Sequence, residues 1–206
     1  LRLTSNWLSN LPDDVFQHLS SLELLDMGHT NLQRISQHLL SPFVNLQAAF
    51  LNSNQLTEIH PDAFKYLENL TFLDISINFL TSFPDGLFQN NTNLRQFFAT
   101  SNFITRLDRK SFGIHPFGNV INIENNRIVE IDPQFFESFP QLQTFNARAN
   151  LCADAFLTNL STIDFEVERS LNECFFNWFN PTSGVDGVFK GGLMVFFVVI
   201  GSIVMQ

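Results

Sequence analysis

Hydrophobic and polar positions along this chain repeat with a period of 24 residues. Asparagines keep that interval, with Thr30 taking the one missing step, at Asn6, Asn54, Asn78, Asn102, Asn126 and Asn150. A second series, mostly phenylalanine, runs in step with them at Phe16, Leu40, Phe64, Phe88, Phe112 and Phe136. Because both series stay in phase along the chain, they indicate repeated structural units.

The positions between these markers predict what each unit looks like. Alternating apolar residues, such as Leu73 and Ile75 before Asn78, predict a short strand with one buried face. One such strand cannot bury its face alone, so successive units should stack into a solenoid with a parallel sheet along one side. We expect each asparagine to satisfy buried backbone groups of its own turn and of the next coil. The phenylalanine series should form a second row of the core.

The frame LxxLxLxxNxLxxL resembles that of extracellular leucine-rich repeat proteins of the typical 24-residue subfamily. The stretches 59–64 and 131–136, each with a proline ahead of a phenylalanine, resemble the second half of that repeat, and the resemblance covers roughly residues 1–174. It implies an α/β solenoid, a horseshoe with a parallel concave sheet and a disulfide-closed C-terminal cap. The implied domains are repeats over 1–150 in about six to seven units, a cap over 151–176, a juxtamembrane spacer over 177–190 and a hydrophobic tail over 191–206.

Strand residues between the buried positions should form the surface of the concave sheet. One predicted column reads Arg2, Asp26, Phe50, Asp74, Phe98, Asn122 and Asn146, and its neighbour reads Leu24, Ala48, Phe72, Gln96, Val120 and Thr144. Exposed aromatic clusters often mark a protein contact. The candidate ligand-binding residues are therefore Phe50, Phe72 and Phe98, with Ile77 extending them and Asp26 and Asp74 at their rim. Alternatively, the phenylalanines pack on one another or lie under a glycan, and the two charges are simply solvated.

The period ends after Asn150. Residues 154–160 predict a short helix, and a terminal cap is needed because the last coil would otherwise expose its core. The resemblance implies a Cys152–Cys174 disulfide that holds the cap, although the family's usual cap has four cysteines; two free buried thiols are the alternative. Three sequons predict N-glycosylation at Asn69, Asn90 and Asn159.

The two ends of the chain bear on where the protein works. Residues 191–205 form an apolar run that follows small residues, an order that resembles a GPI-attachment signal with Ser183 as the candidate site. A transmembrane helix that continues beyond Gln206 and a buried helix are the alternatives. The chain starts at Leu1 without a methionine or a signal peptide, which indicates a fragment lacking its N-terminus. We expect a cell-surface protein with extracellular repeats, attached to the plasma membrane through its tail.

Charge and motif content narrow the function. The chain has 20 acidic and 11 basic residues and a net charge of −9, so we expect no nucleic-acid partner. Its five histidines lack metal-ligand spacing and no enzyme motif is present, so we expect no enzyme, no cofactor and no metal. The predicted function is recognition of a protein or glycoconjugate through the concave face, of adhesion or innate-immune type. One alternative is a structural or co-receptor scaffold that clusters other membrane proteins, and another is an intracellular repeat scaffold. The protein itself could form a homo- or hetero-oligomer.

Overall fold

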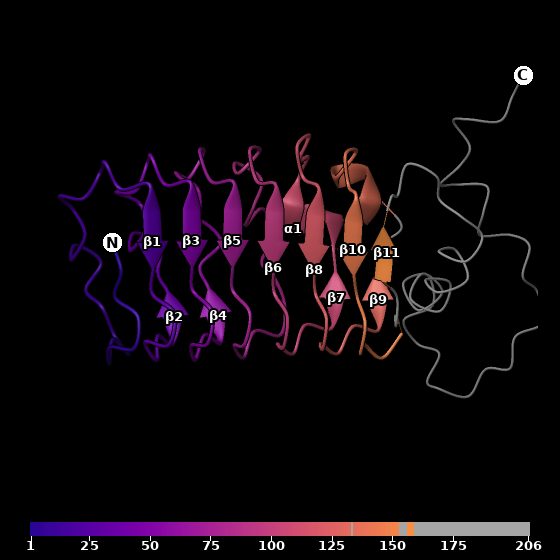
Figure 1. Cartoon of the computed structure of the whole chain (residues 1–206), viewed down its shortest axis with the longest axis horizontal. Helices are drawn as coiled ribbons and strands as arrows, with labels where there is room; N and C mark the ends of the chain where they lie inside the picture. Colours follow the sequence, from indigo (N-terminus) through magenta and orange to yellow (C-terminus); the bar gives the residue numbers. More distant parts are fainter. Residues whose placement is uncertain (133, 153–155, 159–206) are drawn as a thin grey trace, which may run out of the picture.

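The structure is a computed structural model, and it describes residues 1–132, 134–152 and 156–158. Successive coils stack side by side, and each contributes one short strand to a sheet along the front of the molecule (Figure 1). In order, the strands of this sheet are β1 (Leu24–Asp26), β3 (Ala48–Phe50), β5 (Phe72–Asp74), β6 (Gln96–Phe98), β8 (Val120–Asn122), β10 (Thr144–Asn146) and β11 (Phe156–Thr158). Strands β1 to β10 are parallel, which confirms the expected solenoid.

The register of the parallel strands follows the sequence period. Leu24 pairs with Ala48, Ala48 with Phe72 and so on to Thr144, while Asp26 pairs with Phe50 and the series continues to Asn146. Arg2 forms an isolated bridge with Asp26 at the head of the second series. The register of both predicted columns is therefore confirmed, although Asn146, at the end of the second series, is buried and not on the surface. Between them lies a buried column that joins the sheet to the core, consisting of Leu25, Ala49, Leu73, Phe97, Ile121 and Phe145.

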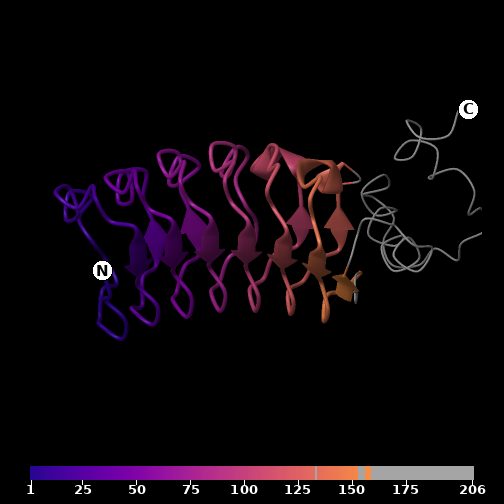
Figure 2. The same ribbon diagram turned by 45° about the horizontal axis from the view of Figure 1, so that its top comes forward.

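The connecting segments behind the sheet carry little regular structure, and Figure 2 shows them as a row of loops beside the strands. Two small parallel sheets lie there, β2 (Arg34–Ile35) with β4 (Glu58–Ile59) and β7 (Arg106–Leu107) with β9 (Glu130–Ile131). The helices among the described residues are α1 (Arg109–Phe112) and the 3-10 helix η1 (Phe135–Ser138). The second side of the solenoid is therefore mostly turns, with less helix than an α/β class implies.

Phenylalanines fill the space between the sheet and the connecting segments. The ring centroid of Phe88 lies 5.6 Å from that of Phe64 and 5.0 Å from that of Phe112, and both pairs of rings are stacked. The predicted row ends differently, because η1 turns Phe135 into the core and leaves Phe136 only partly buried. The prediction is therefore wrong at Phe136. It is confirmed at the buried residues Phe16, Leu40, Phe64, Phe88 and Phe112.

The asparagines form a ladder of amides that ties each coil to its neighbour. Asn78 accepts a hydrogen bond at Oδ1 from the Leu56 N–H (2.9 Å) and donates from Nδ2 to the carbonyls of Leu51 (3.1 Å) and Ile75 (3.0 Å). Leu51 and Leu56 belong to the coil before Asn78, so the link runs to the preceding coil and not to the next one as expected. Asn6 bonds the carbonyls of its own turn. The interlocking pattern recurs at Asn54, Asn102, Asn126 and Asn150.

One histidine belongs to the core. His115 is fully buried, and its ring stacks on Phe139 with centroids 5.2 Å apart. Nδ1 lies 3.1 Å from the Asn91 carbonyl oxygen and Nε2 lies 2.8 Å from the Phe112 carbonyl oxygen. Burial lowers the pKa of His115 below its ordinary value of 6.5, and the two carbonyl contacts, which favour the protonated ring, offset this only in part.

Acid should therefore destabilise the fold through His115. The folded state favours the neutral ring and the unfolded chain binds the proton more readily, so stability is lost as pH falls below 6.5. The free energy of unfolding should drop by up to about 1.4 kcal/mol per pH unit in that window. Urea unfolding at pH 7.5 and 5.5 measures this, with His115→Gln as the non-titrating comparison. An equal pH dependence of unfolding in the unmodified chain and in His115→Gln would show that His115 does not cause the loss of stability in acid.

The C-terminal end of the sheet departs from the prediction. Residues 156–158 form strand β11, which pairs antiparallel with β10, where a helix was expected. An extended segment can satisfy the hydrogen-bonding groups on the open edge of β10, which a helix cannot do. Cys152 is partly buried and packs against the core. Cys174, Asn159, Ser183, the spacer and the tail lie outside the described residues, and within those residues no helix has the length and apolar character to cross a membrane.

Candidate functional site

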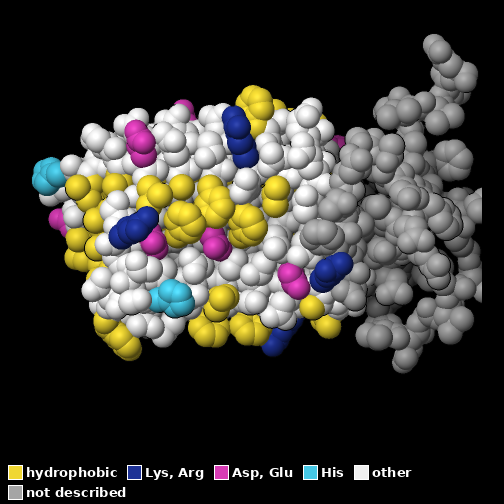
Figure 3. All heavy atoms as spheres, viewed as in Figure 1, with side chains coloured by type: hydrophobic (Ala, Val, Ile, Leu, Met, Phe, Trp, Pro, Cys, Tyr) yellow, Lys and Arg dark blue, Asp and Glu magenta, His cyan; other side chains and the backbone are white. Residues whose placement is uncertain are grey.

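Three phenylalanines form a contiguous aromatic patch on the concave face. The ring centroids of Phe50 and Phe72 are 4.8 Å apart and those of Phe72 and Phe98 are 5.4 Å apart. Each side chain is half-buried, because the three rings pack on one another across β3, β5 and β6. Figure 3 shows a band of hydrophobic side chains running across the strands, with acidic groups along its lower margin. The structure thus brings the three predicted aromatic residues together.

The polar members of the surface column that contains Phe50 and Phe98 share one local hydrogen bond. Asp26, Asp74, Asn122 and Asn146 each accept, at Oδ1, the backbone N–H two residues further on, at 2.9–3.2 Å. Such a bond stabilises the chain as it leaves the strand. Phenylalanine at position 50 or 98 cannot form it. The aromatic residues therefore give up a local stabilising contact and place apolar surface on an open sheet.

Ile77 lies apart from this patch, in the turn after β5. It has φ = 56°, a left-handed conformation that costs an L-residue about 1–2 kcal/mol and is least tolerated by β-branched side chains. Its side chain is 55% exposed. It stands in a column of left-handed residues that we call the turn edge, which also contains Ser5, His29, Ser53, Ser101, Asn125 and Ala149.

Sequence reasoning missed a second aromatic cluster beside the turn edge. The rings of Phe79 and Phe103 stack with centroids 6.0 Å apart, and the Arg127 guanidinium lies 4.4 Å from the Phe103 ring centroid. Phe79 is 49% exposed. The signal was present in the sequence, because these three residues are 24 apart and each directly follows a ladder asparagine.

A shallow polar depression of about 420 Å³ lies at the opposite margin of the sheet, where the chain enters the strands. Asn69 is exposed there, and its Nδ2 donates to the Val44 carbonyl (2.9 Å). Thr71, the hydroxyl residue of the same sequon, donates to the Gln47 carbonyl (3.0 Å). The depression is lined by Glu23, Asn45, Gln47, Asn69, Thr71, Asn93 and Arg95.

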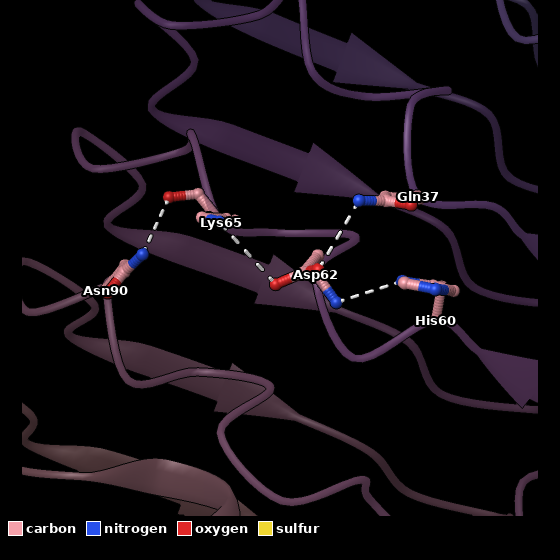
Figure 4. A network of polar contacts seen from close by, with 5 residues as sticks. All are labelled: Gln37, His60, Asp62, Lys65 and Asn90. Atoms are coloured by element: carbon pink, nitrogen blue, oxygen red, sulfur yellow. Dashed lines mark hydrogen bonds and ion pairs between the residues drawn. The ribbon is translucent and has the colours of Figure 1, made fainter.

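The second described sequon lies among the connecting segments. The Nδ2 of Asn90 donates to the Lys65 carbonyl (3.2 Å), and the Lys65 ammonium lies 3.9 Å from the Asp62 carboxylate (Figure 4). Asp62 also accepts from Gln37 (3.4 Å), and its N–H donates to His60 Nδ1 (3.1 Å). His60 therefore has a local structural contact.

The arrangement offers non-covalent binding surface. Among the described residues, no three His, Cys, Asp or Glu side chains gather where they could hold a metal ion. The concave face provides aromatic surface, carboxylates and amides, which suit the recognition of a partner by contact area and charge.

Comparison with known families decides what kind of solenoid this is. A family model for the leucine rich repeat matches residues 1–56 and 45–104. The chain belongs to the leucine-rich repeat family. No curated protein matches the sequence.

Two solved structures are similar to this leucine-rich repeat chain. One is TLR13 in its complex with ssRNA13, at 27% identity and a TM-score of 0.62, over 66% of this chain and 20% of that one. The other is Toll in the Drosophila Toll–Spatzle complex, at 26% identity and a TM-score of 0.64, over 73% of this chain and 21% of that one. The chain therefore spans about a fifth of each of these proteins. The first of these structures is a complex with an RNA and the second is a complex with a protein.

Proposed function

We propose that this chain is the recognition module of an innate-immune type receptor, and that it binds a protein ligand through the concave face of its repeats. The observation that carries the proposal is the aromatic patch of Phe50, Phe72 and Phe98. Aromatic residues grouped on an exposed sheet are typical of the centre of a protein interface. Similarity to the Toll and TLR13 structures supports the receptor class.

A protein ligand suits this surface better than a nucleic acid. The net charge is −9, and two carboxylates, Asp26 and Asp74, share a surface column with Phe50 and Phe98. Phosphate binding depends on lysine and arginine that displace counterions, and carboxylates beside the patch oppose it. We keep the expectation of no nucleic-acid partner, and of no enzymatic activity, as part of this proposal.

The test removes the aromatic patch and leaves the fold. The full chain is screened against a displayed library of extracellular domains, and the affinity of each binder is then measured for the variant Phe50→Ser/Phe72→Ser/Phe98→Ser. Loss of three central aromatic contacts should weaken binding at least about 100-fold. Thermal unfolding checks that the variant folds.

The matched control is Phe79→Ser/Phe103→Ser, which removes the other exposed aromatic cluster. Binding that survives the triple substitution and is lost in the control would overturn the concave-face proposal. That result would favour the second candidate function, a scaffold or co-receptor that clusters membrane proteins through its turn edge. The observation behind this candidate is the stacked pair Phe79–Phe103 beside the strained residue Ile77.

We also propose that the protein works at the cell surface, with extracellular repeats and a membrane-attached tail. Within the described residues, exposed Asn69 and half-buried Asn90 are the two candidate glycosylation sites that support this proposal. The remaining parts of this proposal are the Asn159 glycan, the Cys152–Cys174 bridge that closes the cap and GPI attachment at Ser183. A gel shift on deglycosylation tests the compartment. Release from cells by a phosphatidylinositol-specific phospholipase distinguishes the lipid anchor from a spanning helix.

A further inference from the structure

Asp26 and Asp74 carry a charge that the fold does not need. Their Oδ1 atoms accept the N–H groups of Gly28 (3.2 Å) and Ser76 (2.9 Å). Two neutral asparagines in the same column accept the equivalent bonds, each at 3.2 Å. Because an amide oxygen accepts the same bond, the negative charge at these two positions is free to act on a ligand at the surface.

The two carboxylates bracket one ring of the aromatic patch. Asp26, Phe50 and Asp74 are consecutive members of one column on β1, β3 and β5. Adjacent strands lie about 4.8 Å apart, so the two aspartates stand about 10 Å apart with Phe50 between them. Phe72 adds a second ring, 4.8 Å from Phe50 between centroids.

The two aspartates differ in their neighbours within the column. Arg2 is the neighbour of Asp26 in this column on the side away from Phe50. The ion pairs of the described residues involve Asp62, Glu130 and Glu137, and neither Asp26 nor Asp74 takes part in one. Asp74 therefore has a phenylalanine on each side in its column, Phe50 and Phe98, and no basic residue next to it there.

We propose that the concave face binds a basic protein segment, with one lysine or arginine side chain lying over Phe50 between Asp26 and Asp74. An ammonium or guanidinium group within about 6 Å of an aromatic ring is attracted to its face, and flanking carboxylates add to this attraction. This inference rests on the proposed function and names the chemistry of the ligand.

The surface around the aspartates fits a segment whose basic residue is flanked by apolar ones. Leu24, on β1, is 37% exposed, and Val120, on β8, is half-buried, so apolar surface continues on both sides of the aromatic patch. An extended peptide alternates its side chains and can place a cation and its apolar neighbours on this surface. A phosphate backbone would bring its charges against the same carboxylates and be repelled.

The experiment selects ligands by chemistry. A displayed library of random 12-residue peptides is selected on the immobilised full chain, and dissociation constants of the selected peptides are measured by fluorescence anisotropy. The selected peptides should be enriched in lysine or arginine next to apolar residues. Asp74→Asn should weaken the binding of these peptides about 10-fold. Asp26→Asn should weaken their binding less, because Arg2 stands next to Asp26 in the column.

The control must separate this local effect from the overall charge. Asp14→Asn/Asp85→Asn makes the same change in net charge as the Asp26/Asp74 double variant, at exposed positions in the connecting segments, and should leave binding within about twofold. Both concave-face variants keep the backbone hydrogen bond, as Asn122 and Asn146 show.

Each outcome decides something. Peptides that bind the Asp26→Asn/Asp74→Asn variant as tightly as the unmodified chain, and that still need Phe50, Phe72 and Phe98, overturn the basic ligand and leave the concave-face function standing. A single-stranded RNA oligonucleotide that binds in a patch-dependent way overturns the basic ligand as well. Peptides that tolerate loss of the aromatic patch, or a selection without any patch-dependent peptide, overturn both.

Discussion

Replacing Asn78 with alanine lowers the free energy of unfolding by at least about 2 kcal/mol. The substitution leaves the buried Leu56 N–H without its partner. It also removes one of the two amide donors to each of the Leu51 and Ile75 carbonyls, which keep their bonds from Asn54 and Asn102, and each such lost bond costs about 0.5–1.5 kcal/mol. Each buried backbone group left without a hydrogen bond costs about 1–3 kcal/mol. The Asn78 side chain is 3% exposed, so water has little access to replace it. Urea unfolding followed by circular dichroism measures the loss.

The comparison for Asn78 is Asn93→Ala. Asn93 also donates from Nδ2 to a carbonyl of the preceding coil, that of Glu68 (2.9 Å), but it is exposed. Water can satisfy both groups there, so this substitution should cost less than about 1 kcal/mol. Equal losses in the two variants would show that burial of the ladder is not what makes its hydrogen bonds important.

Phe112→Ala should destabilise the fold by about 3–5 kcal/mol, the usual cost of deleting a large buried aromatic side chain. Phe112 is 1% exposed, and its ring contacts the rings of Phe88, Phe97 and Phe135 with centroids 5.0, 5.7 and 5.3 Å away. Three different coils meet in this contact, so a cavity at Phe112 loosens the packing between coils. Thermal and urea unfolding give the size of the effect.

The matched substitution is Phe117→Ala. Phe117 is 53% exposed, and its described ring contact is with the Arg95 guanidinium, 6.0 Å from the ring centroid. We expect a loss below about 1 kcal/mol. A loss at Phe112 no larger than at Phe117 would mean that the phenylalanine row adds little to stability.

The 24-residue period determined much of the fold and of the candidate site before any coordinates were considered. Because strand side chains alternate and the strands pair at one repeat displacement, the sequence frame alone put Phe50 and Phe98 in one surface column and Phe72 in the next. The same frame assigned Asn78 to the ladder. It could not give the direction of the ladder bonds, since both neighbouring coils lie at the same spacing.

Packing overrides the repeat at Gly118. Gly118 stands at a leucine position, and a Cβ there would come 2.8 Å from a Phe139 ring carbon. The phenylalanine of the following segment has taken the space of the missing leucine, and His115 packs on the same ring. Ile77 was assigned to the concave face because it is apolar and near the ladder. Its left-handed turn conformation, which sequence alone does not show for an isoleucine, puts it at the turn edge.

The backward direction of the asparagine ladder has a consequence for synthesis of the chain. A coil has a buried backbone N–H that is satisfied only by the asparagine of the coil after it, as the Leu80 N–H is by Asn102 Oδ1 (3.1 Å). The Ile75 carbonyl likewise gains a second donor from Asn102 (3.1 Å), beside Asn78 of its own coil (3.0 Å). During synthesis from the N-terminus, a coil is therefore incomplete until the next repeat has left the ribosome. Folding should lag translation by one repeat. Hydrogen exchange at the Leu80 amide, compared between ribosome-bound chains that end before and after Asn102, would report that delay.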